Sequence, residues 1–353
     1  MNDYEGMDLE PLLRSALGRV PKISIASMFG QASSRRYYRL TLQDRREGEP
    51  ATIVVMRLPE DATRSDEGGG AEALEELPFL TVASLLNARG VRIPHVLAHD
   101  LSRLAVLLED LGDESFEDRL IARGRDAWPE LYGMAIDRLA EIHERCQDVP
   151  ADHIVATRRF DRELLRWELD HFREWGLEAL VGDIPERHEL DALFDRLTDA
   201  LVKHPQGFVH RDYQSRNLMW KDDELVLIDF QDAMRGPRVY DLVALLCDSY
   251  VSIDEDLQRA MIKRYAATRA LDSEALEAEF WEQAIQRKLK DAGRFIYIDR
   301  VRKNPGFLVS FPQSIEYVRR ALSHAPRWSA IDAILEKRLP GYPDAVAVPA
   351  ATS

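Results

Sequence analysis

The chain has 353 residues, 45% hydrophobic and 31% charged, which are ordinary globular proportions that exclude wholesale disorder and a collagen-like chain. Its 47 basic and 62 acidic residues give a formal net charge of −15, which disfavours binding to a nucleic-acid backbone or to an anionic membrane surface. The length indicates two domains or one large two-lobed unit.

The N-terminal sequence, the apolar runs and the cysteines indicate the cellular compartment of the protein. The N-terminal sequence MNDYEGMDLE lacks the apolar segment of a signal peptide, and no run approaches the ~18 apolar residues of a membrane span. Cys146 and Cys247 lie far apart in apolar helical surroundings, which predicts buried free thiols and disfavours a disulfide framework or a zinc site. We therefore expect a cytoplasmic protein.

The N-terminal part of the chain predicts an antiparallel sheet. After a short helical pattern over 9–17, β-branched and aromatic runs at 24–29, 37–42 and 51–58 are joined by polar turns. A polar loop and a helix then lead to two further strands. That loop is expected at 61–70, the helix at 72–88, and the strands at 96–98 and 104–108.

The pattern becomes helical after about residue 115. Apolar residues at helical spacing predict helices at 132–146, 164–180 and 190–202, and a short hairpin is expected at 218–228. Asp241 is expected to cap the next helix, and the chain then alternates helices and turns to about residue 338.

The predicted fold class is therefore α+β, with two lobes and a cleft at their junction. The N-terminal antiparallel-sheet lobe covers residues 1–108 and the hinge covers 109–114. The larger, mostly helical lobe covers 115–339, and residues 340–353 form a loose tail.

The segment 210–217 (HRDYQSRN), followed by 228–230 (IDF), carries the chemistry. H-R-D-x-x-x-x-N is a catalytic-loop pattern for phosphoryl transfer, and D-F opens a metal-binding turn. Asp212 is then the catalytic base that takes the proton of the acceptor hydroxyl. Asn217 and Asp229 are the ligands of Mg²⁺, which lies against the phosphates of ATP. The spacing of these two ligands suits the hairpin between them.

The N-terminal lobe supports nucleotide binding less specifically. Gly30, Ser33 and Ser34 lie between two predicted strands, where they suit a phosphate-binding turn and an ordinary hairpin turn equally. Arg57, near the end of the third strand, is the candidate phosphate-binding cation, with a solvated arginine as the alternative. Its candidate glutamate partners, which the sequence does not separate, are Glu72, Glu75 and Glu76.

These motifs resemble those of the aminoglycoside phosphotransferase and choline kinase superfamily, which has a protein-kinase-like fold. The resemblance is closest to the bacterial N-acetylmuramate/N-acetylglucosamine anomeric kinases of cell-wall recycling. The segments that carry it are 34–39 (SRRYYR), 107–112 (LLEDLG), 167–175 (WELDHFREW), 228–233 (IDFQDA) and 240–242 (YDL).

The resemblance implies ATP-dependent phosphorylation of the anomeric C1 hydroxyl of N-acetylmuramic acid and N-acetylglucosamine. The sugar 1-phosphate then passes to a uridylyltransferase and leads to UDP-N-acetylmuramic acid. Glu109 and Leu111 are expected at the adenine-binding hinge. The expected sugar contacts are Glu168, His171, Trp175, Arg211 and Arg300, for which packed aromatic rings and structural ion pairs are the alternatives.

Three other functions were weighed against this one. A kinase for another hydroxyl compound, such as an aminoglycoside or choline, fits the same motifs. A protein kinase is disfavoured because V-A-I-K and A-P-E signatures are absent from the sequence. A non-catalytic nucleotide-binding regulator is disfavoured because Asp212, Asn217 and Asp229 are all present. The preferred sugar, the product anomer, the oligomeric state and regulation do not follow from the sequence.

Overall fold

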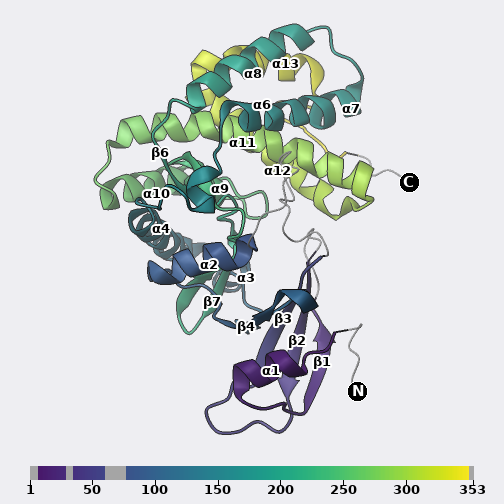
Figure 1. Cartoon of the computed structure of the whole chain (residues 1–353). Helices are drawn as coiled ribbons and strands as arrows, with labels where there is room; N and C mark the ends of the chain where they lie inside the picture. The colour runs from purple at the N-terminus through teal and green to yellow at the C-terminus, as the bar shows by residue number, and fades with distance from the viewer. Residues whose placement is uncertain (1–6, 29–34, 60–76, 350–353) are drawn as a thin grey trace. The chain divides into compact units, whose positions relative to one another are not determined.

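The computed structural model describes residues 7–28, 35–59 and 77–349, and Figure 1 shows the course of the chain. The chain forms two compact units, which are described separately below. The first consists of Met1–Glu114 and Met219–Gln231, and the second of Ser115–Leu218 and Asp232–Ser353.

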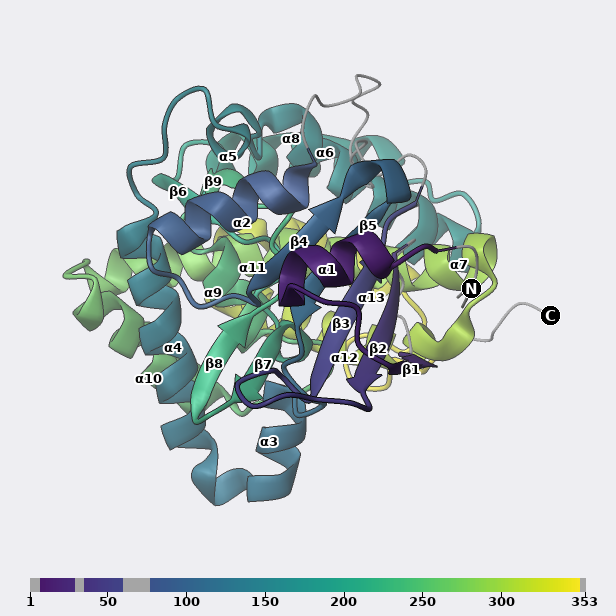
Figure 2. The ribbon, with the colours of Figure 1, turned by 60° about the horizontal axis from the view of Figure 1, so that its bottom comes forward.

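The first unit is built on the antiparallel sheet that the sequence predicts. Its five strands stand in the order β1-β2-β3-β5-β4. They are β1 (Ile23–Ser27), β2 (Arg36–Leu42), β3 (Thr52–Arg57), β4 (Val96–Asp100) and β5 (Ala105–Glu109). Helix α1 (Glu10–Leu17) lies over this sheet in Figure 2. Its Leu12 and Leu13 join one buried cluster with Leu40, Ile53 and Leu107, because alternate strand residues face the same side.

A helix and a hairpin complete this unit: α2 (Pro78–Ala88), then β7 (Leu218–Lys221) and β8 (Glu224–Leu227), with the short helix η1 (Leu101–Arg103). Asp222 and Asp223 have φ values of 50° and 61°, which are typical of a two-residue hairpin turn of type I′. The sequence assigned the hairpin to the region 115–339. In the structure, the backbone N–H of Leu227 donates to the Arg92 carbonyl at 3.1 Å, within the first unit.

The second unit is organised around one long helix, α11 (Ser273–Arg302). It packs against α6 and α8 on one side and against α9 and α10 on the other (Figure 1). The α-helices of this unit are α3 (Phe116–Arg123), α4 (Trp128–Arg145), α5 (Ile154–Thr157), α6 (Arg162–His171), α7 (Ala179–Val181), α8 (Arg187–Leu201), α9 (Tyr240–Leu246), α10 (Glu255–Thr268), α11, α12 (Phe311–His324) and α13 (Ser329–Arg338).

Shorter elements connect these helices. They are η2 (Arg125–Ala127), the π-helix η3 (Phe172–Glu178), β6 (Gln206–Val209), η4 (Ser215–Asn217), β9 (Met234–Pro237), η5 (Pro305–Ser310) and η6 (Pro326–Trp328). Strands β6 and β9 form an antiparallel pair of their own. The predicted sheet-rich N-terminal part and helical remainder are thus confirmed.

The π-helix η3 continues α6 and lies directly against α11. A Cβ atom at Gly293 of α11 would come within 2.7 Å of the Cα of Phe172 and within 3.0 Å of the His171 carbonyl oxygen. No real side chain tolerates such a contact without movement, so glycine at this position permits the two helices to touch. The close approach fixes the end of α6 and the start of η3 on the surface of α11.

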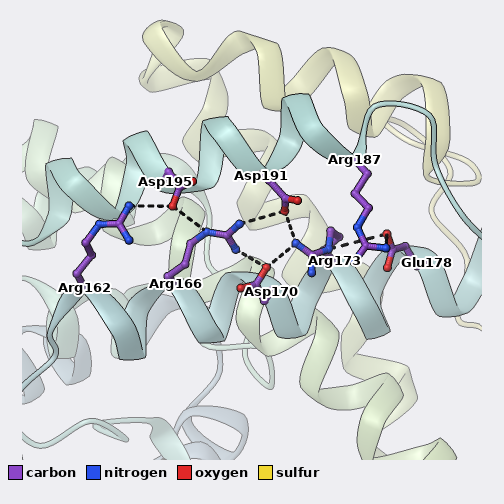
Figure 3. A network of polar contacts seen from close by, with 8 residues as sticks. All are labelled: Arg162, Arg166, Asp170, Arg173, Glu178, Arg187, Asp191 and Asp195. Carbon is purple, nitrogen blue, oxygen red and sulfur yellow. Dashed lines mark hydrogen bonds and ion pairs between the residues drawn. The ribbon is translucent and has the colours of Figure 1, made fainter.

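Ion pairs between α6, η3 and α8 hold the other side of this segment (Figure 3). Arg166 contacts Asp191 at 3.0 Å and Asp195 at 3.2 Å, and Arg173 contacts Asp170 at 2.5 Å and also Asp191. Single exposed ion pairs contribute little to stability, but shared carboxylates form a network that restrains several side chains together. Packing on α11 and this network together restrain α6 and η3 from two sides.

The cysteine prediction is confirmed, since Cys146 and Cys247 are buried free thiols. Burial raises the pKa of the Cys247 thiol to about 12. Across the described ranges, no helix combines the length and the apolar character needed to cross a bilayer.

One charge pair restrains the loop that follows β5. Arg39 of β2 donates from Nε and Nη2 to the two carboxylate oxygens of Asp110, at 2.6 and 3.0 Å. Two more hydrogen bonds hold the same loop. The backbone N–H of Gly112 donates to the Asp110 carboxylate, and Lys221 donates to the Asp110 carbonyl at 3.0 Å. Burial alone would raise the pKa of Asp110, but the contacts with Arg39, Gly112 and Thr52 together outweigh it and hold the pKa below its ordinary value.

Replacing Arg39 by methionine should lower the free energy of unfolding by about 2 kcal/mol, because the buried Asp110 carboxylate would lose its bidentate partner. Chemical denaturation followed by circular dichroism measures this change. Arg45→Met, at an exposed position just beyond β2, is the matched control and should stay within about 0.5 kcal/mol of wild type. Equal effects of the two substitutions would contradict the assignment.

The effect of Arg39→Met should also depend on pH. The folded-state pKa of Asp110 lies below its unfolded value of ~3.9, so the pair stabilises the fold fully above that value. This contribution is lost as the pH falls through the folded-state pKa. The difference in unfolding free energy between wild type and Arg39→Met should therefore be constant near neutrality and shrink below about pH 4.

Candidate active site

The loop 210–217 follows β6 in the second unit and ends with η4, and its start is held by Asp241 of α9. The Asp241 carboxylate accepts the backbone N–H groups of His210 at 2.7 Å and Arg211 at 2.9 Å. It also lies 3.0 Å from Nε2 of His143. Burial would raise the pKa of Asp241, but the contacts with His143 and His210 together outweigh it and keep the pKa below the ordinary value.

The expectation that Asp241 caps α9 is wrong. Asp241 is the second residue of α9, and Val239 stands at the N-cap without a side-chain cap bond. An aspartate at a helix start suits either role by pattern alone. The carboxylate turns to the loop instead, because two buried backbone N–H groups there need acceptors.

Asp212, the predicted base, is fixed through its backbone and presents its carboxylate. Its carbonyl accepts from the backbone N–H of Gln214 at 2.8 Å and from Nδ2 of Asn217 at 2.9 Å. Its side chain is 36% exposed, with Arg287 Nη2 at 3.5 Å from Oδ1. Arg211, just before it, has φ of 86°, a strained conformation of the kind that clusters at functional sites. A restrained, accessible carboxylate suits proton abstraction.

Asn217, the predicted metal ligand of this unit, ends η4. Because its Nδ2 faces the Asp212 carbonyl, the amide oxygen is the atom left for a ligand. The same turn is held by Asp248, which accepts from the backbone N–H of Ser215 at 2.8 Å and from its hydroxyl at 2.5 Å. Burial raises the pKa of Asp248 above its ordinary value.

Asp229, the other predicted metal ligand, belongs to the first unit and follows β8. Its φ is 61°, and its side chain is 37% exposed. The carboxylate accepts from Nε2 of Gln231 at 3.0 Å and pairs with Arg35 at 3.4 Å. Phe230 is buried and stacks on Phe79 with ring centroids 4.9 Å apart, which anchors the turn next to Asp229.

The donor set suits magnesium. The Asp229 carboxylate and the Asn217 amide supply hard oxygen atoms, and Mg²⁺ commonly takes one or two such ligands beside substrate phosphates. In the part of the chain that the structure describes, no cluster of three or more His, Cys, Asp or Glu side chains forms a metal site. The metal-ligand assignment stays a prediction.

The predicted phosphate-binding residues Gly30, Ser33 and Ser34 lie outside the described residues. So do the candidate glutamate partners of Arg57. Arg57 is half-buried at the end of β3, paired in register with Arg36 and Ala105. Strand alternation puts it on the face of Ile53 and Val55, which α1 covers. Its role as a phosphate-binding cation stays a prediction.

Glu109 and Leu111 flank Asp110 after β5. The Glu109 carboxylate accepts two bonds from Arg92, at 2.6 and 2.8 Å, and one from the backbone N–H of His95 at 3.1 Å. Burial would raise the pKa of Glu109, but the contacts with Arg92 and His95 together outweigh it and the pKa lies below its ordinary value. Leu111 is buried. Since both carboxylate oxygens of Glu109 accept hydrogen bonds from Arg92, a nucleotide contact at this position would be made by the backbone of Glu109.

Two of the predicted sugar-binding residues form a buried ionic contact with each other. Glu168 of α6 is fully buried, accepts from Nε2 of Gln286 at 2.7 Å and faces Nη2 of Arg211 at 3.5 Å. The contact joins α6 to the loop and to α11. Arg300, a third predicted sugar contact, donates to the carbonyl of Ala179, the first residue of α7, at 2.8 Å.

His171 and Trp175, the remaining predicted sugar contacts, belong to one aromatic cluster. Their ring centroids are 6.4 Å apart, and both rings contact Tyr297 of α11, at 5.1 and 5.3 Å. Trp167 stacks on His171 at 5.5 Å and is 45% exposed. The cluster offers partly exposed ring faces on α6, η3 and α11, and its contact with sugar stays a prediction.

Sequence reasoning missed Arg287 and Tyr297 and left the role of Asp248 open. Arg287 and Tyr297 lie on α11, whose buried and exposed faces do not differ clearly in polarity along the sequence. An arginine in such a pattern is typical of a solvated surface. A distinguishing signal for Asp248 is its position seven residues after Asp241 at the end of an apolar run, where an isolated carboxylate must find buried partners.

The comparisons with known proteins agree with this arrangement. Residues 28–280 match the model of the phosphotransferase enzyme family. The chain therefore belongs to this family and is an enzyme that transfers a phosphoryl group. Its sheet unit and helical unit are those of the protein-kinase-like fold of aminoglycoside and choline kinases.

Individual proteins of known name or structure are similar to the chain over most of its length. The chain is 31% identical to the N-acetylmuramate/N-acetylglucosamine kinase of Pseudomonas aeruginosa, over 90% of this chain and 89% of that protein. Among solved structures, it is similar to the choline kinase LicA of Streptococcus pneumoniae, with a TM-score of 0.57, 13% identity and coverage of 89% and 96%. It also resembles the ADP-bound aminoglycoside phosphotransferase APH(2'')-Ib, with a TM-score of 0.55, 16% identity and coverage of 92% and 99%.

Replacing Asp212 by asparagine should lower kcat roughly 10²–10⁴-fold, because the amide cannot take a proton from the acceptor. The unfolding free energy should change by less than about 1 kcal/mol, since the carboxylate is partly exposed. A coupled assay of ADP release and a denaturation curve measure the two effects. Asp222→Asn, in the exposed hairpin turn, is the control and should keep wild-type activity. Full activity of Asp212→Asn would exclude Asp212 as the base.

Proposed function

We propose that the protein is an ATP-dependent kinase that phosphorylates the anomeric C1 hydroxyl of N-acetylmuramic acid and N-acetylglucosamine. The observation that carries the proposal is its 31% identity, over nine-tenths of the chain, to a kinase named for these two sugars. Asp212, Asn217 and Asp229, to which we assign phosphoryl transfer, lie within residues 28–280, which match the family model.

The proposed reaction is a direct transfer. The hydroxyl at C1 of a free sugar is a hemiacetal hydroxyl, more acidic than an ordinary alcohol, so a carboxylate base suffices. Asp212 takes its proton as the sugar oxygen forms a bond to the γ-phosphorus, and the bond from that phosphorus to the β-phosphate oxygen breaks to release ADP. The backbone contacts of the 210–217 loop orient Asp212 for this task.

Asn217 and Asp229 are the oxygen donors that we assign to Mg²⁺. The bound metal would neutralise charge that develops on the phosphates. We further assign nucleotide contacts to Gly30, Ser33, Ser34, Arg57, Glu109 and Leu111.

The acceptor contacts belong to the same proposal. Aromatic rings suit the apolar face of a sugar ring, so we assign Trp175 and His171 to it. The lactyl carboxylate of N-acetylmuramic acid needs a cation, for which Arg211 and Arg300 are candidates. Because Arg211 already faces Glu168, with side chains 3% and 0% exposed, Arg300 is the more accessible of the two.

The sugar 1-phosphate would be the substrate of a uridylyltransferase and lead to UDP-N-acetylmuramic acid. We place the reaction in the cytoplasm, where ATP is supplied and where free thiols such as those of Cys146 and Cys247 persist.

An ATP-consumption screen over neutral, anionic and cationic acceptors tests the proposal. We expect turnover of N-acetylmuramic acid and N-acetylglucosamine, loss of turnover with EDTA and recovery with Mg²⁺. NMR of the product should show phosphorus coupling to the anomeric proton. Phosphate at C6 would exclude an anomeric kinase, and turnover of only choline or an aminoglycoside would identify a different acceptor class.

Replacing Trp175 by alanine should raise KM for the sugar about 5–10-fold with little change in KM for ATP, because a ring face is removed from the aromatic cluster. Trp175→Phe keeps an aromatic face and should recover most of the affinity. Steady-state kinetics with each substrate varied in turn makes the measurement. An unchanged KM for the sugar in Trp175→Ala would remove Trp175 from the acceptor site.

A further inference from the structure

Arg287 of α11 makes two contacts with the 210–217 loop. Its Nη1 donates to the Arg211 carbonyl at 2.8 Å, and its Nη2 lies 3.5 Å from Oδ1 of Asp212. We propose that Arg287 is a positioning residue for phosphoryl transfer, which holds the Asp212 carboxylate in the orientation needed to receive the acceptor proton. The inference rests on the proposed function, in which Asp212 is the base.

The burial of Arg287 shows that this contact is not incidental. The residue is 1% exposed, and its guanidinium lies 4.7 Å from the ring centroid of Tyr240. Among the described residues, its Nη2 has no hydrogen-bond acceptor, and Asp212 is the carboxylate paired with it. A buried guanidinium with an unfilled donor is costly to fold. The 3.5 Å contact between Arg287 Nη2 and Asp212 Oδ1 can shorten to a hydrogen bond when the acceptor binds.

The chemistry favours arginine over any other cation at this position. A guanidinium presents several N–H groups in a rigid plane, so one side chain can reach a carbonyl and a carboxylate together. The carbonyl belongs to Arg211, whose φ of 86° is a strained conformation. Arg287 thus fixes the strained peptide and the following carboxylate as one unit.

The neighbouring residue of α11 strengthens this connection. Gln286 donates to Glu168 at 2.7 Å, and Glu168 faces the Arg211 side chain at 3.5 Å. The backbone and the side chain of Arg211 are therefore both restrained from adjacent positions on α11. The orientation of the catalytic loop depends on this helix as well as on its own turn.

A base held in the wrong direction lowers the rate of the chemical step without weakening binding. Arg287→Met should therefore reduce kcat about 100-fold, with KM for ATP and for the acceptor changed by less than about threefold. Arg287→Lys keeps the charge but can fill only one of the two contacts. It should reduce kcat about tenfold.

Lys288→Met provides the matched control. Lys288 is also 1% exposed on α11, but it contacts Ser249 at 2.5 Å and Asp291 at 2.7 Å and makes no contact with the loop 210–217 among its hydrogen bonds and ion pairs. Removing this buried cation should lower the melting temperature while kcat per folded molecule stays within about threefold of wild type. A purely structural Arg287 would behave in the same way.

Steady-state kinetics at a temperature well below each melting point, normalised to the folded fraction, makes the comparison. The proposal fails if Arg287→Lys keeps wild-type kcat, or if Arg287→Met and Lys288→Met lose kcat equally. If Arg287→Met does not fold, the kcat of Arg287→Lys alone tests the proposal. The wild type in the same assay tests the proposed function separately, since the ratios are taken on whichever acceptor the wild type phosphorylates.

Discussion

The loop 210–217 depends on one constraint: its backbone leaves regular structure in a buried place, where every N–H and C=O needs a partner. Strand β6 ends at Val209, and the next two N–H groups have no strand to pair with. Asp241 accepts both of them, and Arg287 donates to the Arg211 carbonyl. One anion and one cation from different helices thus hold a strained segment that local propensity would not maintain. The exposed carboxylate of Asp212 is the consequence of this restraint.

The same solution recurs in the sheet unit. The loop after β5 is irregular, and a single arginine, Arg39, holds it through two bonds to Asp110. In both places, a fork-shaped donor joins chain segments that lie far apart in the sequence. Buried ion pairs are weak sources of net stability, but they select one conformation of a loop because alternatives leave a charge unpaired. The Arg39–Asp110 and Arg287–Asp212 pairs therefore determine the conformation of their loops more than they add to the net stability of the fold.

How much the sequence predicts follows from these interactions. Alternating apolar residues were enough for the five strands, and motif spacing was enough to single out Asp212, Asn217 and Asp229. Helix α11 was not foreseen as one 30-residue helix, because it buries glutamine, arginine and lysine beside leucine and phenylalanine. Arg287 escaped notice for the same reason. Hydrophobic periodicity indicates which face of a helix is apolar, but it does not identify a polar side chain that is buried against a partner distant in the sequence.

Helix α11 also connects the loop of Asp212, the proposed base, to the aromatic cluster. Arg287 contacts the loop 210–217, Gly293 contacts the start of η3, and Tyr297 packs against Trp175. A helix rises ~1.5 Å per residue, so the ten residues from Arg287 to Tyr297 span ~15 Å. Because one helix carries all three contacts, the loop that contains Asp212, the start of η3 and the aromatic cluster are held on one continuous element. In the proposed mechanism, α11 therefore positions both the base and the rings that bind the acceptor.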